Sequence, residues 1–88
     1  GTNYTFTSYR TPIAMLKASS GVMFLNRRVF SYSRTTTRHF LNYLENVLTA
    51  EKPTRATVEN WIENGCIPAS ENCYHTDIDI RLVNEEDL

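Results

Sequence analysis

Residues 40–48 read Phe-Leu-Asn-Tyr-Leu-Glu-Asn-Val-Leu, and this stretch decides the fold class. Its apolar residues recur at intervals of three and four, which places them on one face of a helix. The hydroxyl residues Thr35, Thr36 and Thr37 precede this stripe and can cap the start of a helix. We therefore predict a helix over about residues 36–49 that packs on a core through its apolar stripe.

A second helix is expected over about residues 55–64. Thr54 is a natural N-cap, and Gly65 suits the left-handed position that ends a helix. Between them, Val58 and Trp61 lie on an apolar stripe at helical spacing. We expect this stripe to face the same core as the first helix.

Strands are predicted on both sides of the helices. Aromatic and β-branched residues are interleaved with polar ones over residues 4–32, which favours two or three antiparallel strands. Residues 75–83 alternate strictly between apolar and polar, as in a strand with one wet face. The sequence thus predicts one α+β domain over residues 1–88, a small antiparallel sheet of about three to four strands packed on two helices. Residues 84–88 are expected to be a frayed acidic tail.

Composition excludes several classes of protein. The chain has 88 residues and is 41% hydrophobic and 22% charged, which is ordinary for a folded domain and unlike a disordered chain. No apolar run approaches the roughly 18 residues that a membrane helix needs. No segment has the pattern of a signal peptide. We therefore expect a cytoplasmic protein that does not bind membranes.

Charge is divided unevenly along the chain. Residues 1–44 hold six Lys and Arg and no acidic residue, whereas residues 45–88 hold three basic and ten acidic residues. Halves of opposite sign either expose an anion-binding face or neutralise each other inside the fold. The sequence alone leaves both arrangements open.

The cations gather at the expected start of the first helix, where residues 33–39 read Ser-Arg-Thr-Thr-Thr-Arg-His. Free N–H groups and the helix dipole favour anions at this end, so cations there work against the dipole. Either a phosphate of nucleic acid or of a nucleotide, or a carboxylate from the acidic C-terminal strand, would relieve the conflict. The candidate residues for binding nucleic acid or another anion are Arg27, Arg28, Arg34, Thr36, Thr37, Arg38 and His39.

Aromatic rings lie among these cations in the sequence. Basic residues interleaved with aromatic ones can bind single strands through stacking and phosphate contacts. The alternative is that most of the rings are core, because a small domain needs their area. The rings are Tyr4, Phe6, Tyr9, Phe24, Phe30, Tyr32 and Tyr43.

Motifs of enzymes and metal sites are missing from the sequence. It contains three glycines and no phosphate-cradling glycine loop, HExxH motif or nucleophile elbow. Cys66 and Cys73 lack the spacing of a zinc site, and the sequence does not decide between two free thiols and a disulfide. We expect a non-enzymatic protein without a metal, a cofactor or a catalytic residue.

Two sequence blocks carry a resemblance to known proteins. Residues 8–14 read SYRTPIA and residues 32–39 read YSRTTTRH, with Asn26 between them. Through these blocks, residues 8–46 resemble a family of short uncharacterised phage and mobile-element proteins with an SYxTx(I/V)A…N…YSxTT(S/T)(K/R)(H/Q) pattern. The resemblance implies a viral or mobile-element origin, a small accessory role and, if the protein is phage-encoded, the host cytoplasm. It implies no activity.

A second likeness concerns residues 54–68, which read TRATVENWIENGCIP. They are similar to the recognition-helix stretch of excisionase-like and mercury-resistance-regulator-like helix-turn-helix domains. Glu59, Asn60 and Glu63 stand where such domains usually place basic residues, and carboxylates repel phosphate. The simpler interpretation is that the stretch is a capped helix with a core stripe.

Two functions follow as hypotheses from these residues. The first is a small accessory binding module that contacts nucleic acid through its basic N-terminal half. The alternative is an inhibitor or regulator that binds a host protein through its acidic C-terminal half. The candidate residues for that alternative are Glu59, Glu63, Asp77 and Asp79.

Overall fold

Five strands and two helices make up the structure, a computed structural model that describes residues 2–88. Residue 1 lies outside the described residues. In chain order the elements are β1 (Asn3–Ser8), β2 (Thr11–Lys17), β3 (Val22–Asn26), α1 (Arg34–Leu48), α2 (Arg55–Asn64), β4 (Cys66–Ile67) and β5 (Ile78–Val83). Two short 3₁₀ turns, η1 (Ala69–Glu71) and η2 (Glu85–Asp87), flank β5.

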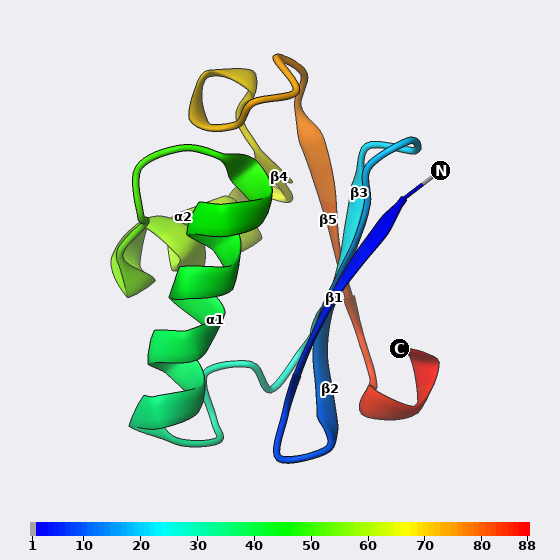
Figure 1. Ribbon diagram of the computed structural model, residues 1–88, viewed down its shortest axis with the longest axis vertical. Helices are drawn as coiled ribbons and strands as arrows, with labels where there is room; N and C mark the ends of the chain where they lie inside the picture. The colour runs from blue at the N-terminus through cyan, green and yellow to red at the C-terminus, as the bar shows by residue number, and fades with distance from the viewer. Residues whose placement is uncertain (1) are drawn as a thin grey trace.

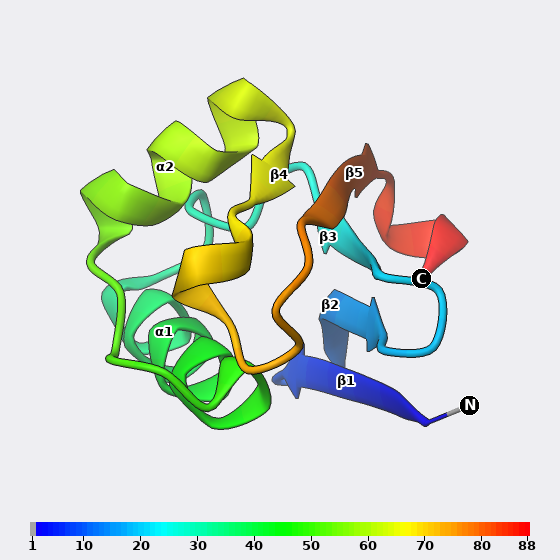
Figure 2. The ribbon, with the colours of Figure 1, turned by 90° about the horizontal axis from the view of Figure 1, so that it is seen from above.

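The strands form one mixed sheet in the order β1-β2-β3-β5-β4. Both helices lie on the same face of this sheet (Figures 1 and 2). The predicted α+β class is therefore confirmed. The sheet differs from the expected antiparallel sheet of three to four strands in having five strands, with β3 and β5 paired in parallel. A parallel pair needs a long crossover, and residues 27–77 supply it by carrying both helices across the sheet.

The core lies between the sheet and the helices. The predicted core residues Phe40, Leu44 and Leu48 on α1 are each no more than 1% exposed, and Trp61 on α2 is 5% exposed. Val47, Ile62 and Ile80 pack against the margin of this core and are only partly buried. The sheet contributes buried residues from its three central strands and from β4, namely Ile13, Ala14, Leu16, Met23, Leu25, Ile78 and Ile67.

Four element boundaries differ from the sequence predictions. The N-cap of α1 is Ser33 rather than a threonine, so the helix begins earlier. Residues 29–32, expected as strand, form turns in which the Ser31 N–H donates to the Arg28 carbonyl. The last strand begins at Ile78 rather than at residue 75. The expected acidic tail, residues 84–88, contains the 3₁₀ turn η2.

Aromatic packing ties α1 to the edge strand β1. The Tyr43 ring stacks on Phe6 with 5.5 Å between the ring centroids. Its hydroxyl donates a hydrogen bond of 2.5 Å to the Tyr4 carbonyl. Burial raises the pKa of the Tyr43 phenol well above its ordinary value, so the hydroxyl stays a donor. Of the seven rings named above, Tyr4, Tyr9 and Tyr32 are exposed and the other four are half-buried.

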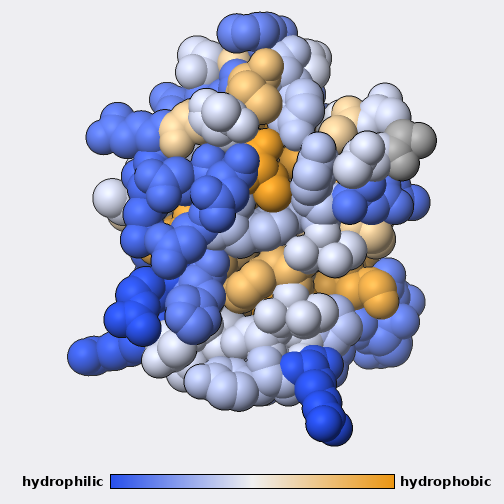
Figure 3. Space-filling model, in the orientation of Figure 1, coloured by the Kyte–Doolittle hydropathy of each residue, from blue (hydrophilic) through white to orange (hydrophobic). Residues whose placement is uncertain are grey.

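The helix side of the molecule is strongly hydrophilic. Figure 3 shows hydrophilic side chains gathered over this side, with apolar surface mainly in the seam between the helices and the sheet. Within residues 2–88, neither helix is long and apolar enough to cross a bilayer.

Candidate anion-binding site

A hydroxyl network fixes the first turn of α1. The Ser33 Oγ accepts a hydrogen bond of 3.1 Å from the Thr36 N–H, which caps the helix. The Thr36 hydroxyl lies 2.8 Å from Ser8 Oγ on β1 and is buried. Thr36 was expected to bind an anion, and the structure instead uses its hydroxyl to join α1 to the sheet.

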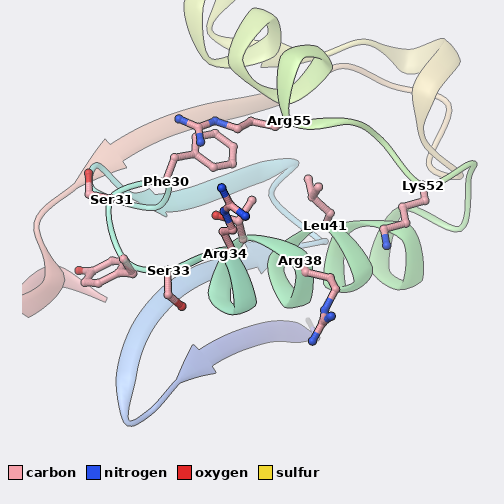
Figure 4. A pocket seen from close by; sticks show the side chains of 10 residues that line it. Phe30, Ser31, Ser33, Arg34, Arg38, Leu41, Lys52 and Arg55 are labelled. Atoms are coloured by element: carbon pink, nitrogen blue, oxygen red, sulfur yellow. The ribbon is translucent and has the colours of Figure 1, made fainter.

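An open pocket of about 430 Å³ lies beside this first turn. It is framed by the loop before α1, by two turns of α1 and by the connector to α2 (Figure 4). Its lining residues are Phe30, Ser31, Tyr32, Ser33, Arg34, Thr37, Arg38, Leu41, Lys52 and Arg55. We call this the cationic pocket, because its charged lining residues are Arg34, Arg38, Lys52 and Arg55, and none is acidic.

Most of these cations have no carboxylate partner in the part of the chain that the structure describes. Among residues 2–88, the Arg55–Glu59 pair is the one ion pair within 4.0 Å, with 2.7 Å from Nε to Oε1. Asp77 belongs to the acidic segment 75–83 that could have supplied such a carboxylate, and its side chain accepts from the Ala69 N–H instead. The structure therefore does not pair the arginines with the acidic strand, which was one of the two arrangements that the sequence left open.

Arg55 differs from the other cations because it is held on two sides. Its guanidinium carbon lies 4.8 Å from the centroid of the Phe30 ring, in addition to the contact with Glu59. Figure 4 shows Arg55 across Phe30 and Arg34 rising towards them from the first turn of α1. Arg38 points outward from the next turn. Arg34, Arg38 and Lys52 are thus the cations that remain available to a ligand.

A second hollow of about 310 Å³ adjoins the first. It is lined by Asn26, Arg27, Arg28, Tyr32, Asn84, Glu85 and Glu86. The predicted residues Arg27 and Arg28 therefore lie apart from the cationic pocket, opposite two carboxylates of η2. Tyr32 lines both hollows and forms their common wall.

The structure brings together only part of the predicted site. Arg34, Thr37 and Arg38 line the cationic pocket, whereas His39 is exposed and lines neither hollow. Sequence reasoning missed Lys52 and Arg55 as members of the site. Their only signal was positive charge next to Pro53, which does not show where the connector folds.

The residues proposed for a protein partner lie on α2, on β5 and in the loop before β5. Glu59, Glu63, Asp77 and Asp79 are all exposed, and none of them lines the cationic pocket or the second hollow. Glu59 and Asp77 are already engaged by Arg55 and the Ala69 N–H. No shared geometry therefore favours these four residues as one site.

Metal-site geometry is equally absent from the described part of the chain. Within residues 2–88, no three His, Cys, Asp or Glu side chains gather as metal ligands would. Cys66 is half-buried and Cys73 is exposed, and both are free thiols.

Comparison with known proteins gives one match. Residues 1–60 match the sequence model of a family of unknown function, DUF8033. No curated protein and no solved structure matches the chain. The matched region contains every residue that lines the cationic pocket, and it ends before β4 and β5.

Proposed function

The chain belongs to this family of unknown function, DUF8033, and we propose that it is a non-catalytic module that binds nucleic acid phosphates at the cationic pocket. The observation that carries the proposal is a group of three cations, Arg34, Arg38 and Lys52, that line one open pocket and have no carboxylate partner among residues 2–88. Unpaired cations in one concavity create a local positive potential, although the whole chain has a net charge of −1.

The other lining groups suit a phosphate. Hydroxyls of Ser31, Ser33 and Thr37 stand beside the arginines, and hydroxyls and guanidinium groups are common donors to phosphate oxygens. The resemblance of residues 8–46 to phage and mobile-element proteins supports a small accessory role in such an element.

The test is a fluorescence anisotropy titration with labelled single-stranded and duplex oligonucleotides over a range of salt concentrations. We expect binding that weakens steeply with salt, because phosphate contacts release counterions. The double variant Arg34→Ala/Arg38→Ala should bind at least about tenfold more weakly, with a salt slope lower by about two contacts.

A matched control is the double variant Lys17→Ala/Arg81→Ala. It removes the same charge from the opposite face of the sheet, where Lys17 lies over Phe24 and Phe24 pairs in register with Arg81. The control should bind within about twofold of the wild type. An equal loss of affinity in both double variants, or no binding at low salt, would refute the proposal. The binding of a host protein would then be the favoured hypothesis.

A further inference from the structure

Tyr32 occupies a special position between the two hollows. It lies in the loop before α1, is 38% exposed and lines both the cationic pocket and the second hollow. Phe30, the other aromatic residue of the cationic pocket, has Arg55 over its face and Phe40 against it. Tyr32 is therefore the aromatic ring of the pocket that is left for a ligand.

A buried side chain holds the hydroxyl of Tyr32. Asn26, only 1% exposed, donates from Nδ2 to Tyr32 Oη and to the Pro12 carbonyl, each at 2.9 Å. The Asn26 Oδ1 accepts from the Arg28 N–H, also at 2.9 Å. The amide is thus fully used in holding the loop, and the ring is positioned before any ligand arrives. A pre-positioned ring loses little conformational freedom on binding.

An exposed aromatic ring beside unpaired cations suits a particular class of ligand. Nucleobases stack on aromatic side chains, while adjacent phosphates bind the cations of the same groove. In a duplex, each base is already stacked between its neighbours and paired, so its faces are not free for a protein ring. The combination therefore favours unpaired bases.

We propose that Tyr32 is the stacking platform for an unpaired nucleobase and that the ligand of the cationic pocket is single-stranded nucleic acid. This inference rests on the proposed function and names its substrate class. The phosphate next to the stacked base lies on the Arg34 and Arg38 side, because the cationic pocket has no acidic lining residue, whereas Glu85 and Glu86 offset Arg27 and Arg28 in the second hollow.

The experiment compares Tyr32→Leu with Tyr4→Leu. Both remove an exposed ring, since Tyr4 is 41% exposed, but Tyr4 lies on β1 and lines neither hollow. Anisotropy titrations use a labelled oligothymidylate of about 12 nucleotides, an oligouridylate of equal length and a duplex of equal length. Circular dichroism melting confirms that each variant is folded.

We expect the wild type to bind both single strands at least about tenfold more tightly than the duplex, a preference of the size that stacking supplies. Tyr32→Leu should weaken single-strand binding about tenfold, and Tyr4→Leu less than about twofold. Tyr32→Phe, which keeps the ring but loses the hydrogen bond from Asn26, should bind more tightly than Tyr32→Leu.

The outcomes separate this inference from the proposed function. Equal binding of duplex and single strand, or equal effects of Tyr32→Leu and Tyr4→Leu, would overturn the stacking role while salt-dependent binding persists. The absence of binding to every oligonucleotide would overturn both. If Tyr32→Leu proves unfolded, a wild-type NMR titration decides, because stacking must shift the Tyr32 ring resonances more than those of Tyr4.

Discussion

The two helices begin in the same way and differ in what they do with their first cation. Ser33 and Thr54 each cap their helix by accepting from the N–H three residues later. An arginine follows directly in both cases, and neither first turn holds an acidic residue. A cation at this end opposes the helix dipole by about 0.3–1 kcal/mol, so each helix starts with the same electrostatic disadvantage.

Only α2 offsets that disadvantage within the protein. Arg55 pairs with Glu59 on the next turn and lies over the Phe30 ring. Arg34 and Arg38 on α1 have neither an ion pair nor a ring partner among residues 2–88. The comparison shows that the fold can neutralise such a cation when it supplies a carboxylate four residues on. On α1 the charge is left for a ligand.

The largest effect should come from the anchors of the two helices. Phe40→Ala on α1 and Trp61→Ala on α2 should each lower the free energy of unfolding by about 3–5 kcal/mol, because both rings are buried in the same core. Urea denaturation followed by circular dichroism measures both. The helices would then differ in surface charge and not in anchoring.

Phe24→Ala is the control for this measurement. The Phe24 ring is half-buried on the sheet face away from the helices, so its loss should cost well under half as much. A loss below about 1 kcal/mol for Trp61→Ala would contradict the placement of α2 against the core.

The helix caps should show a smaller and unequal effect. Ser33→Ala should cost about 1–2 kcal/mol and Thr54→Ala about 0.5–1 kcal/mol. The reason is that Ser33 also hydrogen-bonds the hydroxyl of the buried Thr36, whereas the corresponding Thr57 is only half-buried. Thermal and urea unfolding of both variants show which loss of stability is larger. Ser33→Thr should keep most of the stability that Ser33→Ala loses. Equal costs would show that the Ser8–Thr36 contact holds α1 without help from Ser33.

The helices themselves were predictable from the sequence, and the sheet was predictable only in part. The spacing of Phe40, Leu44 and Leu48 specifies a helical stripe locally, so α1 and its buried face follow from neighbours in the chain. The parallel pairing of β3 with β5 depends on contacts between residues more than 50 positions apart, such as Val22 with Asp79. No local pattern encodes that register. The two-residue strand β4 is too short to leave a periodic signal.

The residues of the candidate site likewise fall into those that the local sequence predicts and those that only the tertiary fold brings together. Arg34 and Arg38 are one helical turn apart, so their presence on one face could be inferred from the sequence. Lys52 and Arg55 join them only because the connector folds back beside α1. Thr36 was expected to bind a ligand because its actual partner, Ser8, is 28 residues away in the sequence and could not be inferred from local pattern. Local motifs thus predicted the cations and the approximate start of α1, but not which side chains are used in tertiary contacts.

The substitution with the smallest expected effect tests the comparison most directly, because it removes the carboxylate partner of Arg55 and so makes α2 resemble α1. Glu59→Gln removes the carboxylate that neutralises Arg55, and both side chains of this pair are at least half exposed. An exposed pair at this spacing contributes little, so the free energy of unfolding should change by less than about 0.5 kcal/mol. Oligonucleotide affinity at low salt should rise about twofold, because a negative charge beside the cationic pocket is lost, and the gain should fade as salt screens it. Glu63→Gln, which makes the same change one turn further along α2, should have a smaller effect on affinity. If Glu59→Gln instead weakens binding, Glu59 must be positioning Arg55 for the phosphate, and the unpaired cations of α1 would then not be the only ones that the ligand uses.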